Sequence, residues 1–393
     1  MVKTIKFHSF VDLPEGGFEC VICASDHLQP DRVWFKMSPR PSTLSEDAMA
    51  LTMSTLCGQD YSAIEIDLSV SRTVFDVIRE FTKSELTVRK VTDALPKSGR
   101  LGCALNFSGG FDSLAARAIL PEGTPLVSVH FEGGFDREAE FFTKFNPYVL
   151  STNLRALKYN HASWTFMGAG MLLFAETLGC KDVIFGTILE STDWQFLKDP
   201  PAGRRIHIAP FSGLGLECPS LVQGLSEVVT TKVVAKYYPE LMAGALKSLA
   251  APGSEKLYRK YLLAKATLKS RNLNVELPEC RSTDPNRAAT WGEHFTCDIL
   301  SLYMIKQFGL GTAQKMVRGI PDKANELAKR LSLRFLERMN TNFIKTVPSG
   351  LAGYALSRLS DAGVLPYDER DWEEFAEVRT FMSSYYARLK GRT

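Results

Sequence analysis

One pattern constrains the fold of this chain more than any other: between residues 101 and 189, short apolar runs alternate with segments of helical periodicity. The runs are LGCALNF, PLVSVHF, PYVLSTN and KDVIFGTIL, and helices are expected to begin near residues 113, 136 and 162. Uniformly apolar strands that alternate with helices are typical of a parallel sheet. The pattern therefore predicts an α/β domain over residues 99–225, with a parallel sheet and helices on both of its faces.

The regions on either side of this domain have other patterns. Residues 1–98 mix strand-like runs (TIKFHSF, ECVICAS, RVWFKMS, AIEIDLSV) with helical stretches at 46–57 and 73–83, which predicts a separate small α+β domain. The segment DALPKSGR has the proline, glycine and charge that are typical of a linker. Residues 226–393 are expected to be mainly helical, with helices at 228–238, 255–270, 295–308, 320–339 and 372–389.

The composition is that of a folded protein, because 45% of the 393 residues are apolar and 23% are charged. A net charge of +3 leaves a nucleic-acid partner open without indicating one. The N-terminus lacks the apolar core of a secretion signal, and the run WTFMGAGMLLFA is shorter than the roughly 20 residues that a membrane span needs. We therefore expect a cytoplasmic protein without membrane contact, and the sequence does not indicate its oligomeric state.

The eight cysteines are too scattered for a disulfide scaffold and are expected to be reduced. Cys20 and Cys23 form a CxxC pair, but they lie in a strand-like run, where residues three apart point to opposite faces. We therefore do not expect them to share a metal ion, and no second CxxC is present to complete four ligands.

The stretch NFSGGFDS, at the end of the first apolar run, has the features of an anion-binding loop. Gly109 and Gly110 allow a ligand to approach the backbone closely, and the helix that follows directs its positive end toward the loop. The hydroxyls of Ser108 and Ser113 add donors. A carboxylate repels phosphate unless a divalent cation lies between them, so Asp112 is predicted to bind Mg²⁺.

Two other nucleotide-binding loops are excluded by their patterns. A Walker loop requires GK followed by Ser or Thr, and a dinucleotide loop requires GxGxxG; the stretch NFSGGFDS matches neither. Ordinary transfer of a γ-phosphoryl group is therefore disfavoured.

The stretch SGGFDS, directly after a strand, resembles the PP-loop of the N-type ATP pyrophosphatase superfamily, whose fold is of the adenine nucleotide alpha hydrolase type. Members of this superfamily hold the pyrophosphate end of ATP in the loop and attach AMP to a substrate oxygen. The resemblance implies that ATP and Mg²⁺ bind here and that Asp112 and Ser113 take part in catalysis. The residues that it places around the phosphates are Ser108, Gly109, Gly110, Phe111, Asp112 and Ser113.

Later segments are similar to 7-cyano-7-deazaguanine synthase and its relatives. The resemblance places Phe131 and Glu132, after the second apolar run, near adenine. Gly186 and Thr187, at the end of the fourth run, and Asp193 a few residues later would line the site. In the stretch LVQGLSEVV, Glu227 stands where the relatives have a lysine, which is a departure from the family pattern.

Two further groups of residues each leave two interpretations open. The relatives carry four zinc-binding cysteines, whereas the comparable region here has Cys280 and Cys297 with His294, which are either an open zinc site or ordinary residues of a metal-free lobe. Arg204 and Arg205 follow the fourth apolar run, near Lys198. They either bind the leaving pyrophosphate, as catalytic residues, or belong to a solvated loop.

The sequence thus predicts an ATP-dependent, AMP-forming enzyme with ATP and Mg²⁺ as cofactors. It would adenylate a carbonyl or carboxylate oxygen of a small molecule or a modified base, and a nitrogen or sulfur nucleophile would then displace AMP. The alternative is a non-catalytic ATP or AMP sensor that reports to a protein partner, for example in a defence system. The residues do not choose the substrate or the second nucleophile.

Overall fold

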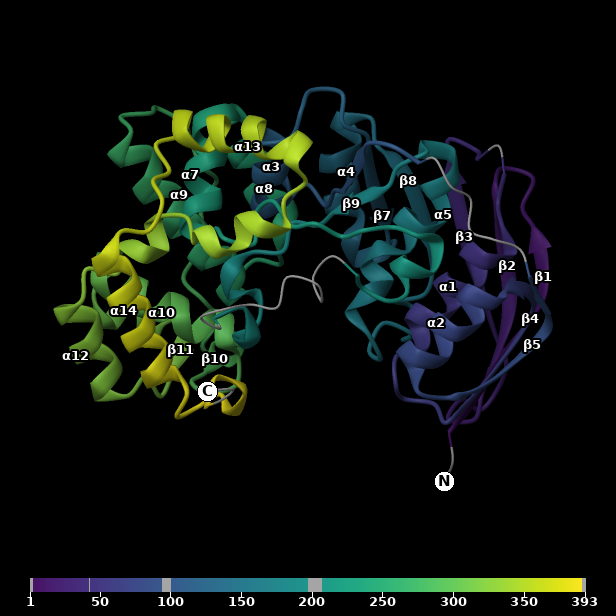
Figure 1. Ribbon diagram of the computed structural model, residues 1–393. Helices are drawn as coiled ribbons and strands as arrows, with labels where there is room; N and C mark the ends of the chain where they lie inside the picture. Colours follow the sequence, from purple (N-terminus) through teal and green to yellow (C-terminus); the bar gives the residue numbers. More distant parts are fainter. Residues whose placement is uncertain (1–2, 42, 94–99, 197–206, 391–393) are drawn as a thin grey trace. The chain divides into compact units, whose positions relative to one another are not determined.

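The computed structural model describes residues 3–41, 43–93, 100–196 and 207–390 (Figure 1). The chain divides into two compact units. The sheet unit consists of residues 1–108, 123–185 and 203–219, and the helical unit consists of residues 109–122, 186–202 and 220–393. Each unit is therefore built from segments that are distant in sequence.

The sheet unit contains a nine-stranded sheet in the order β5-β4-β1-β2-β3-β8-β7-β6-β9. The four strands expected from the alternating pattern, β8, β7, β6 and β9, are parallel to one another, as predicted. The strand bounds are β1 Thr4–Asp12, β2 Gly17–Ala24, β3 Asp31–Ser38, β4 Ala63–Ser71, β5 Glu85–Thr92, β6 Cys103–Asn106, β7 Leu126–His130, β8 Tyr148–Thr152 and β9 Asp182–Ile184.

The N-terminal strands do not form a separate sheet. β3 pairs antiparallel with β8, with Met37 opposite Leu150, and this pairing joins β1–β5 to the parallel strands. The expected division of the chain at residues 98 and 225 therefore differs from the division in the structure. Strand pairing between distant segments extends one sheet across the first expected boundary, and the chain then leaves this unit at residue 109 and again at residue 186.

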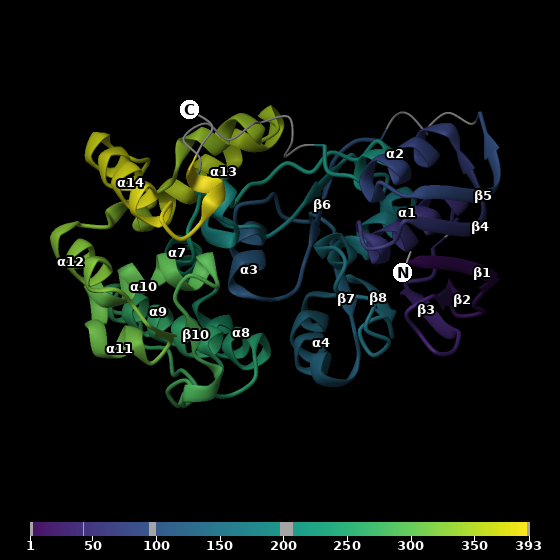
Figure 2. The same ribbon diagram turned by 90° about the horizontal axis from the view of Figure 1, so that it is seen from below.

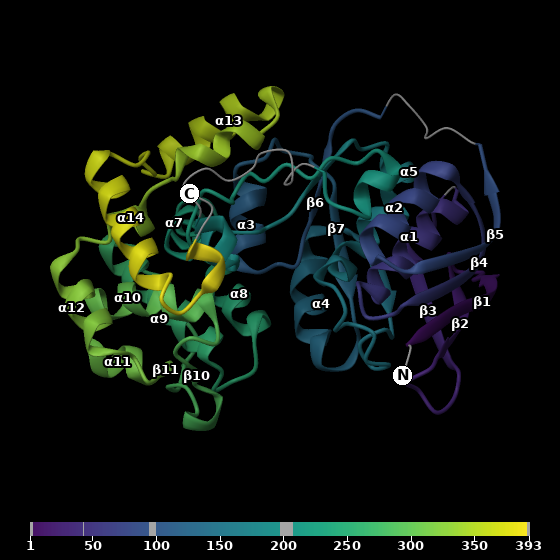
Figure 3. The same ribbon diagram turned by 60° about the horizontal axis from the view of Figure 1, so that its bottom comes forward.

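The helices of the sheet unit are α1 Glu46–Cys57, α2 Arg72–Thr82, α4 Asp136–Phe142 and α5 Ala169–Leu178. Helix α1 begins at Ser45, whose side chain accepts a hydrogen bond from the Ala48 N–H. Helix α1 contacts both α2 and α5 (Figure 3). Consecutive residues Leu126, Val127 and Ser128 of β7 are buried, so both faces of that strand are covered, and both α4 and α5 contact it.

Side-chain alternation along β2 confirms that Cys20 and Cys23 of the CxxC pair point to opposite faces of the strand. Cys20 is 1% exposed within the core, whereas Cys23 is half-buried on the other face of the strand. Phe18, Cys20 and Ile22 all point toward the core.

The helical unit contains α3 Phe111–Ala118, α7 Glu227–Tyr237, α8 Met242–Leu249, α9 Glu255–Ser270, α10 Phe295–Phe308, α11 Leu310–Gln314, α12 Asp322–Arg330, α13 Ser349–Asp361 and α14 Glu369–Met382. Helix α7 contacts both α3 and α9, and α10 contacts α12 (Figure 2). Two short strands, β10 Ala289–Thr290 and β11 Val317–Arg318, pair in parallel. None of the helices in the described ranges is long and apolar enough to cross a membrane.

Two of the expected C-terminal helices differ from the structure. The helix expected over 320–339 ends at Arg330, because the Glu374 carboxylate accepts hydrogen bonds from the backbone N–H groups of Ser332 (2.9 Å) and Leu333 (2.8 Å). Leu333 has a φ of 56°, which an α-helix cannot accommodate. The helix expected over 372–389 is α14, which ends at Met382.

Candidate functional site

A glycine-rich turn joins the end of β6 to the first turn of α3. Gly109 has a φ of 78°, a conformation that disfavours other residues. Gly110 is the N-cap residue of α3, and no side chain of the described residues caps the helix there. Backbone N–H groups at the start of a helix, together with its positive end, attract anions. The turn therefore has the backbone conformation expected of an anion-binding loop.

Two of the predicted loop residues are buried and have structural contacts. Phe111 is 0% exposed and belongs to the core of the unit. Ser113 is 4% exposed, and its hydroxyl donates a hydrogen bond to the Gly110 carbonyl at 2.9 Å. This contact fixes the first turn of α3. The division between the units falls directly after Ser108, so Gly109 to Ser113 belong to the helical unit.

Gly186 lies against the loop backbone, as expected for residues at the ends of neighbouring parallel strands. A Cβ atom at Gly186 would lie 3.1 Å from the Ser113 nitrogen and 3.3 Å from the Asp112 carbonyl carbon. Strand β9 pairs with β6, and this pairing places the carboxyl ends of the two strands side by side. A side chain at position 186 would therefore crowd the loop backbone.

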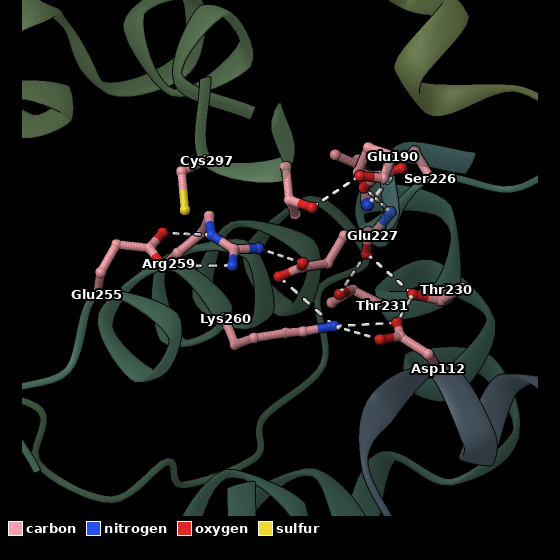
Figure 4. Close-up of polar contacts among 12 residues, drawn as sticks. Asp112, Glu190, Ser226, Glu227, Thr230, Thr231, Glu255, Arg259, Lys260 and Cys297 are labelled. Atoms are coloured by element: carbon pink, nitrogen blue, oxygen red, sulfur yellow. Dashed lines mark hydrogen bonds and ion pairs between the residues drawn. The ribbon is translucent and has the colours of Figure 1, made fainter. Parts of the chain in front are cut away.

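The Asp112 carboxylate is held by two side chains that the sequence analysis did not identify. Its Oδ1 accepts hydrogen bonds from Thr230 Oγ1 at 2.7 Å and from Lys260 Nζ at 3.0 Å, and Lys260 Nζ is 3.2 Å from Oδ2 (Figure 4). Burial alone would raise the pKa of this carboxyl, but the charge of Lys260, aided by the Thr230 hydrogen bond, holds it below its usual value. The side chain is 28% exposed, so Asp112 is only partly buried.

Lys260 lies between two carboxylates. Its side chain is 1% exposed, and its Nζ is 3.4 Å from Glu227 Oε1, an ion-pair distance without the geometry of a hydrogen bond. Glu227 is the residue that stands where the resembling enzymes have a lysine. In this chain the positive charge beside Asp112 therefore comes from α9, and the residue at the start of α7 carries the opposite charge.

The ion pairs continue through the interior of the unit (Figure 4). Arg259 donates to the Glu227 carboxylate, and its Nε is 2.5 Å from Glu255 Oε1. Arg259 is 4% exposed, and although burial lowers its pKa, the charges of Glu227 and Glu255 raise it well above the usual value. We call the five residues Asp112, Lys260, Glu227, Arg259 and Glu255 the charge chain.

Glu190 adds a neutral acid beside the charge chain. It is 0% exposed, and its Oε1 accepts a hydrogen bond from the Glu227 N–H at 2.6 Å. Burial, followed by the negative charge of Glu227, raises the pKa of Glu190 to about 8. Its other oxygen, Oε2, has no hydrogen-bond partner among the described residues. Glu190 is therefore protonated at neutral pH.

The charges of this region bear on the metal that the sequence implies. The charge chain carries three carboxylates and two cations, and the protonated Glu190 beside it adds no charge. The region therefore attracts cations more than anions. Mg²⁺ is commonly bound by one or two carboxylates together with substrate phosphates and water. Asp112, as a partly exposed carboxylate, fits such a role as one ligand.

Two more predicted residues lie in the helical unit. The Thr187 carbonyl accepts a hydrogen bond from the Ser220 hydroxyl at 3.5 Å. Asp193 is largely buried, and its Oδ1 is 3.7 Å from Arg388 Nη1. Both residues therefore also have structural contacts.

The residues expected near adenine belong to the sheet unit. Phe131 is 4% exposed at the end of β7, and Glu132 is exposed with a φ of 56°, unusual for a residue with a side chain. Asn153, at the end of β8, bridges to β3, because its Oδ1 accepts from the Trp34 N–H and its Nδ2 donates to the Arg32 carbonyl, both at 3.0 Å. Asn153 thus stabilises the pairing of β3 with β8.

The structure does not assemble a zinc site from Cys280, His294 and Cys297. No group of three or more His, Cys, Asp or Glu side chains placed to hold a metal occurs in the part of the chain that the structure describes. Cys280 donates to the Arg281 carbonyl, and His294 is the N-cap residue of α10. Burial and the charge of Glu255 raise the pKa of Cys297 to about 12, so this thiol stays protonated. Arg204, Arg205 and Lys198 lie outside the described residues.

Lys260, Thr230 and Glu190 are the residues that sequence reasoning missed. Lys260 is separated from Asp112 by 148 positions, and its surroundings in the sequence, LYRKYLLAK, are those of an ordinary amphipathic helix. The sequence offered one signal for Lys260, the glutamate at position 227. A buried glutamate needs a positively charged partner, and none is adjacent to it in the sequence motif LSEVV.

Comparisons of the chain with protein-family models, with curated proteins and with solved structures find no match.

Proposed function

We propose that this protein is an ATP-dependent, AMP-forming enzyme, an ATP pyrophosphatase that adenylates a carbonyl or carboxylate oxygen of its substrate. The observation that supports this proposal most is the loop of Gly109 to Ser113. It combines a left-handed glycine, a helix N-terminus and a partly exposed carboxylate that is paired with a buried lysine. The family that the loop resembles carries out this chemistry.

In this proposal the phosphates of ATP bind at the backbone N–H groups that begin α3. Asp112 would hold Mg²⁺, which neutralises phosphate charge when bound. Lys260 keeps Asp112 ionised. Thr230 fixes the orientation of the Asp112 carboxylate.

The reaction would proceed by attack of a substrate oxygen on the α-phosphorus. The bond between that oxygen and phosphorus forms as the bond to the bridging oxygen of pyrophosphate breaks, which gives an adenylated substrate and pyrophosphate. A nitrogen or sulfur nucleophile then attacks the activated carbon, and AMP leaves with the substrate oxygen.

A binding experiment tests the first step. Calorimetric titration with ATP in the presence of Mg²⁺ should show binding to the wild type and at least a tenfold weaker affinity for Gly109→Val, because the valine occupies the ligand's space and strains a positive φ. Gly123→Val is the matched control, since Gly123 has a φ of 80° with nothing within 4 Å. Equal affinities for the two variants would contradict a nucleotide site at the loop.

Product analysis tests the chemistry. The protein is incubated with ATP, Mg²⁺, ammonium ions and a protein-free metabolite extract, and the nucleotides are separated by chromatography. AMP and pyrophosphate in equal amounts are expected, and Asp112→Asn should reduce both. Formation of ADP and orthophosphate would refute the proposal.

The buried charge chain favours one alternative, a nucleotide sensor. Ion pairs connect the loop at Asp112 to Glu255 at the start of α9, so a ligand that displaces Lys260 would perturb the interior of the unit. A sensor would bind ATP in the titration and leave it unconsumed in the product analysis.

A further inference from the structure

Arg155 of the sheet unit is surrounded by aromatic rings. Its guanidinium carbon is 4.2 Å from the ring centroid of Phe135, 4.5 Å from that of Phe131 and 5.3 Å from that of Phe166. Phe131 directly follows β7 and Arg155 lies three residues after β8, so the cluster is at the carboxyl ends of two adjacent parallel strands. This edge is where parallel sheets bind their ligands.

Among the described residues, the guanidinium of Arg155 lacks the strong acceptors that a partly buried arginine needs. Its Nε is buried without a hydrogen-bond partner among the described residues, and Nη2 donates to the Met167 thioether at 3.4 Å, a weak acceptor. Of the carboxylates in the described ranges, Glu138 acts on Arg155 through its charge, without a hydrogen bond to it. Burial lowers the pKa of Arg155, which shows the cost of this environment.

The rings leave only the edge of the guanidinium for a ligand. Because aromatic rings pack against the planar group, its remaining contacts are the in-plane N–H donors. Two parallel N–H groups on one edge match the two oxygens of a carboxylate. Met167 is half-buried and has a flexible, unbranched side chain, so it can leave the edge when a stronger acceptor arrives.

A second feature of the backbone marks the same place. Glu132, next to Phe131, has a φ of 56°, and it is exposed at the end of β7. Non-glycine residues in this conformation are costly and are concentrated at ligand sites. The cluster thus combines one donor, Nε, without a partner among the described residues, an apolar lining and a strained residue.

We propose that Arg155, with Phe131, Phe135 and Phe166, forms a binding site for a small molecule that bears a carboxylate beside an aromatic or apolar group. The carboxylate replaces the Met167 thioether on Nε and Nη2, and the rings contact the apolar group. Glu138 is a nearby negative charge that disfavours doubly charged anions such as phosphate. The proposal does not depend on ATP binding at the loop.

Benzoate is the probe for this site, and benzamide is its neutral counterpart of the same shape. Ligand-observed NMR titration of the full chain should show benzoate binding at least tenfold more tightly than benzamide. Arg155→Met should weaken benzoate binding at least tenfold, and Arg155→Lys should weaken it to a lesser extent because a lysine cannot make the paired contact. Arg72→Met is the matched control, because Arg72 is exposed and its guanidinium is 5.5 Å from the Phe75 ring.

Met167→Glu provides a test in which Arg155 itself is kept. A glutamate at this position would place a carboxylate on Arg155 from within the chain, so the variant should melt at a higher temperature than the wild type and lose benzoate binding. Equal binding of benzamide, unchanged benzoate binding in Arg155→Met, or phosphate that displaces benzoate at lower concentration would overturn the proposal. A Met167→Glu variant that still binds benzoate with the wild-type affinity would do so as well.

Discussion

Replacement of Lys260 by methionine tests whether the charge chain is a stabilising part of the helical unit. The substitution keeps most of the side-chain volume and removes the positive charge between Asp112 and Glu227. Breaking a buried ion pair costs about 3–5 kcal/mol, because the remaining charge is left without compensation. Glu227 keeps Arg259 and Asp112 is 28% exposed, so we expect a loss near the lower limit, about 3 kcal/mol.

The loss is measured by urea unfolding followed by circular dichroism. Because the two compact units need not unfold together, hydrogen exchange of the α7 and α9 amides locates the effect. Lys265→Met, an exposed substitution on the same helix, should change the stability by less than about 0.5 kcal/mol. Asp112→Asn added to Lys260→Met should restore about 1 kcal/mol, because it removes one unpaired charge.

The reasoning would be refuted by a loss below about 1 kcal/mol for Lys260→Met together with no recovery in the double variant. That result would mean that solvent or another group compensates Asp112 and Glu227. Lys260→Arg distinguishes charge from packing, since it keeps the charge with a bulkier group; it should retain more stability than Lys260→Met.

Three further predictions concern other residues. Glu190 has a pKa of about 8 in the folded protein and an ordinary value of 4.5, so the folded state binds this proton more tightly than the unfolded state does. The stability of the wild type should therefore fall as the pH rises from about 5 to about 8. Glu190→Gln should flatten this part of the plot of urea midpoint against pH. Gly186→Ala should cost about 1–3 kcal/mol by crowding the loop backbone, whereas Gly350→Ala, in an open position on α13, should not destabilise the protein in the same thermal-unfolding assay. Iodoacetamide should label the half-buried Cys23 in the native protein. Cys57 is 0% exposed and its pKa is raised by burial, so it should be labelled only after unfolding. Peptide mass spectrometry identifies the labelled cysteines.

The parallel strands β6 to β9, the turn at Gly109 and the start of α3 could be predicted because their signals are local. An apolar run, a pair of glycines and a helical period lie within a few residues of one another, and backbone sterics act at that range. The helices α9 and α10 begin and end where their periodicity indicates. The opposite orientations of Cys20 and Cys23 follow in the same way from the alternation of a strand.

The pairing of β3 with β8 could not be predicted from local signals. Asn153 and Trp34 are 119 positions apart, and edge strands of similar composition present the same unpaired N–H and carbonyl groups to any partner. Which strands pair depends on how the whole unit buries its apolar surface. The expected boundary at residue 98 therefore lies within a continuous sheet.

The sequence by itself determined the glycine-rich turn and the carboxylate that it carries, because residue type and backbone freedom depend on consecutive residues. Only the tertiary structure decided what neutralises that carboxylate: Lys260, from a helix 148 positions away, lies beside Asp112 because α7 packs against both α3 and α9. The same holds for Arg155, whose ring neighbours come from segments on either side of it in the sequence. Charge pairing acts over a few ångströms in space, and separation along the chain carries no information about it once the helices have packed.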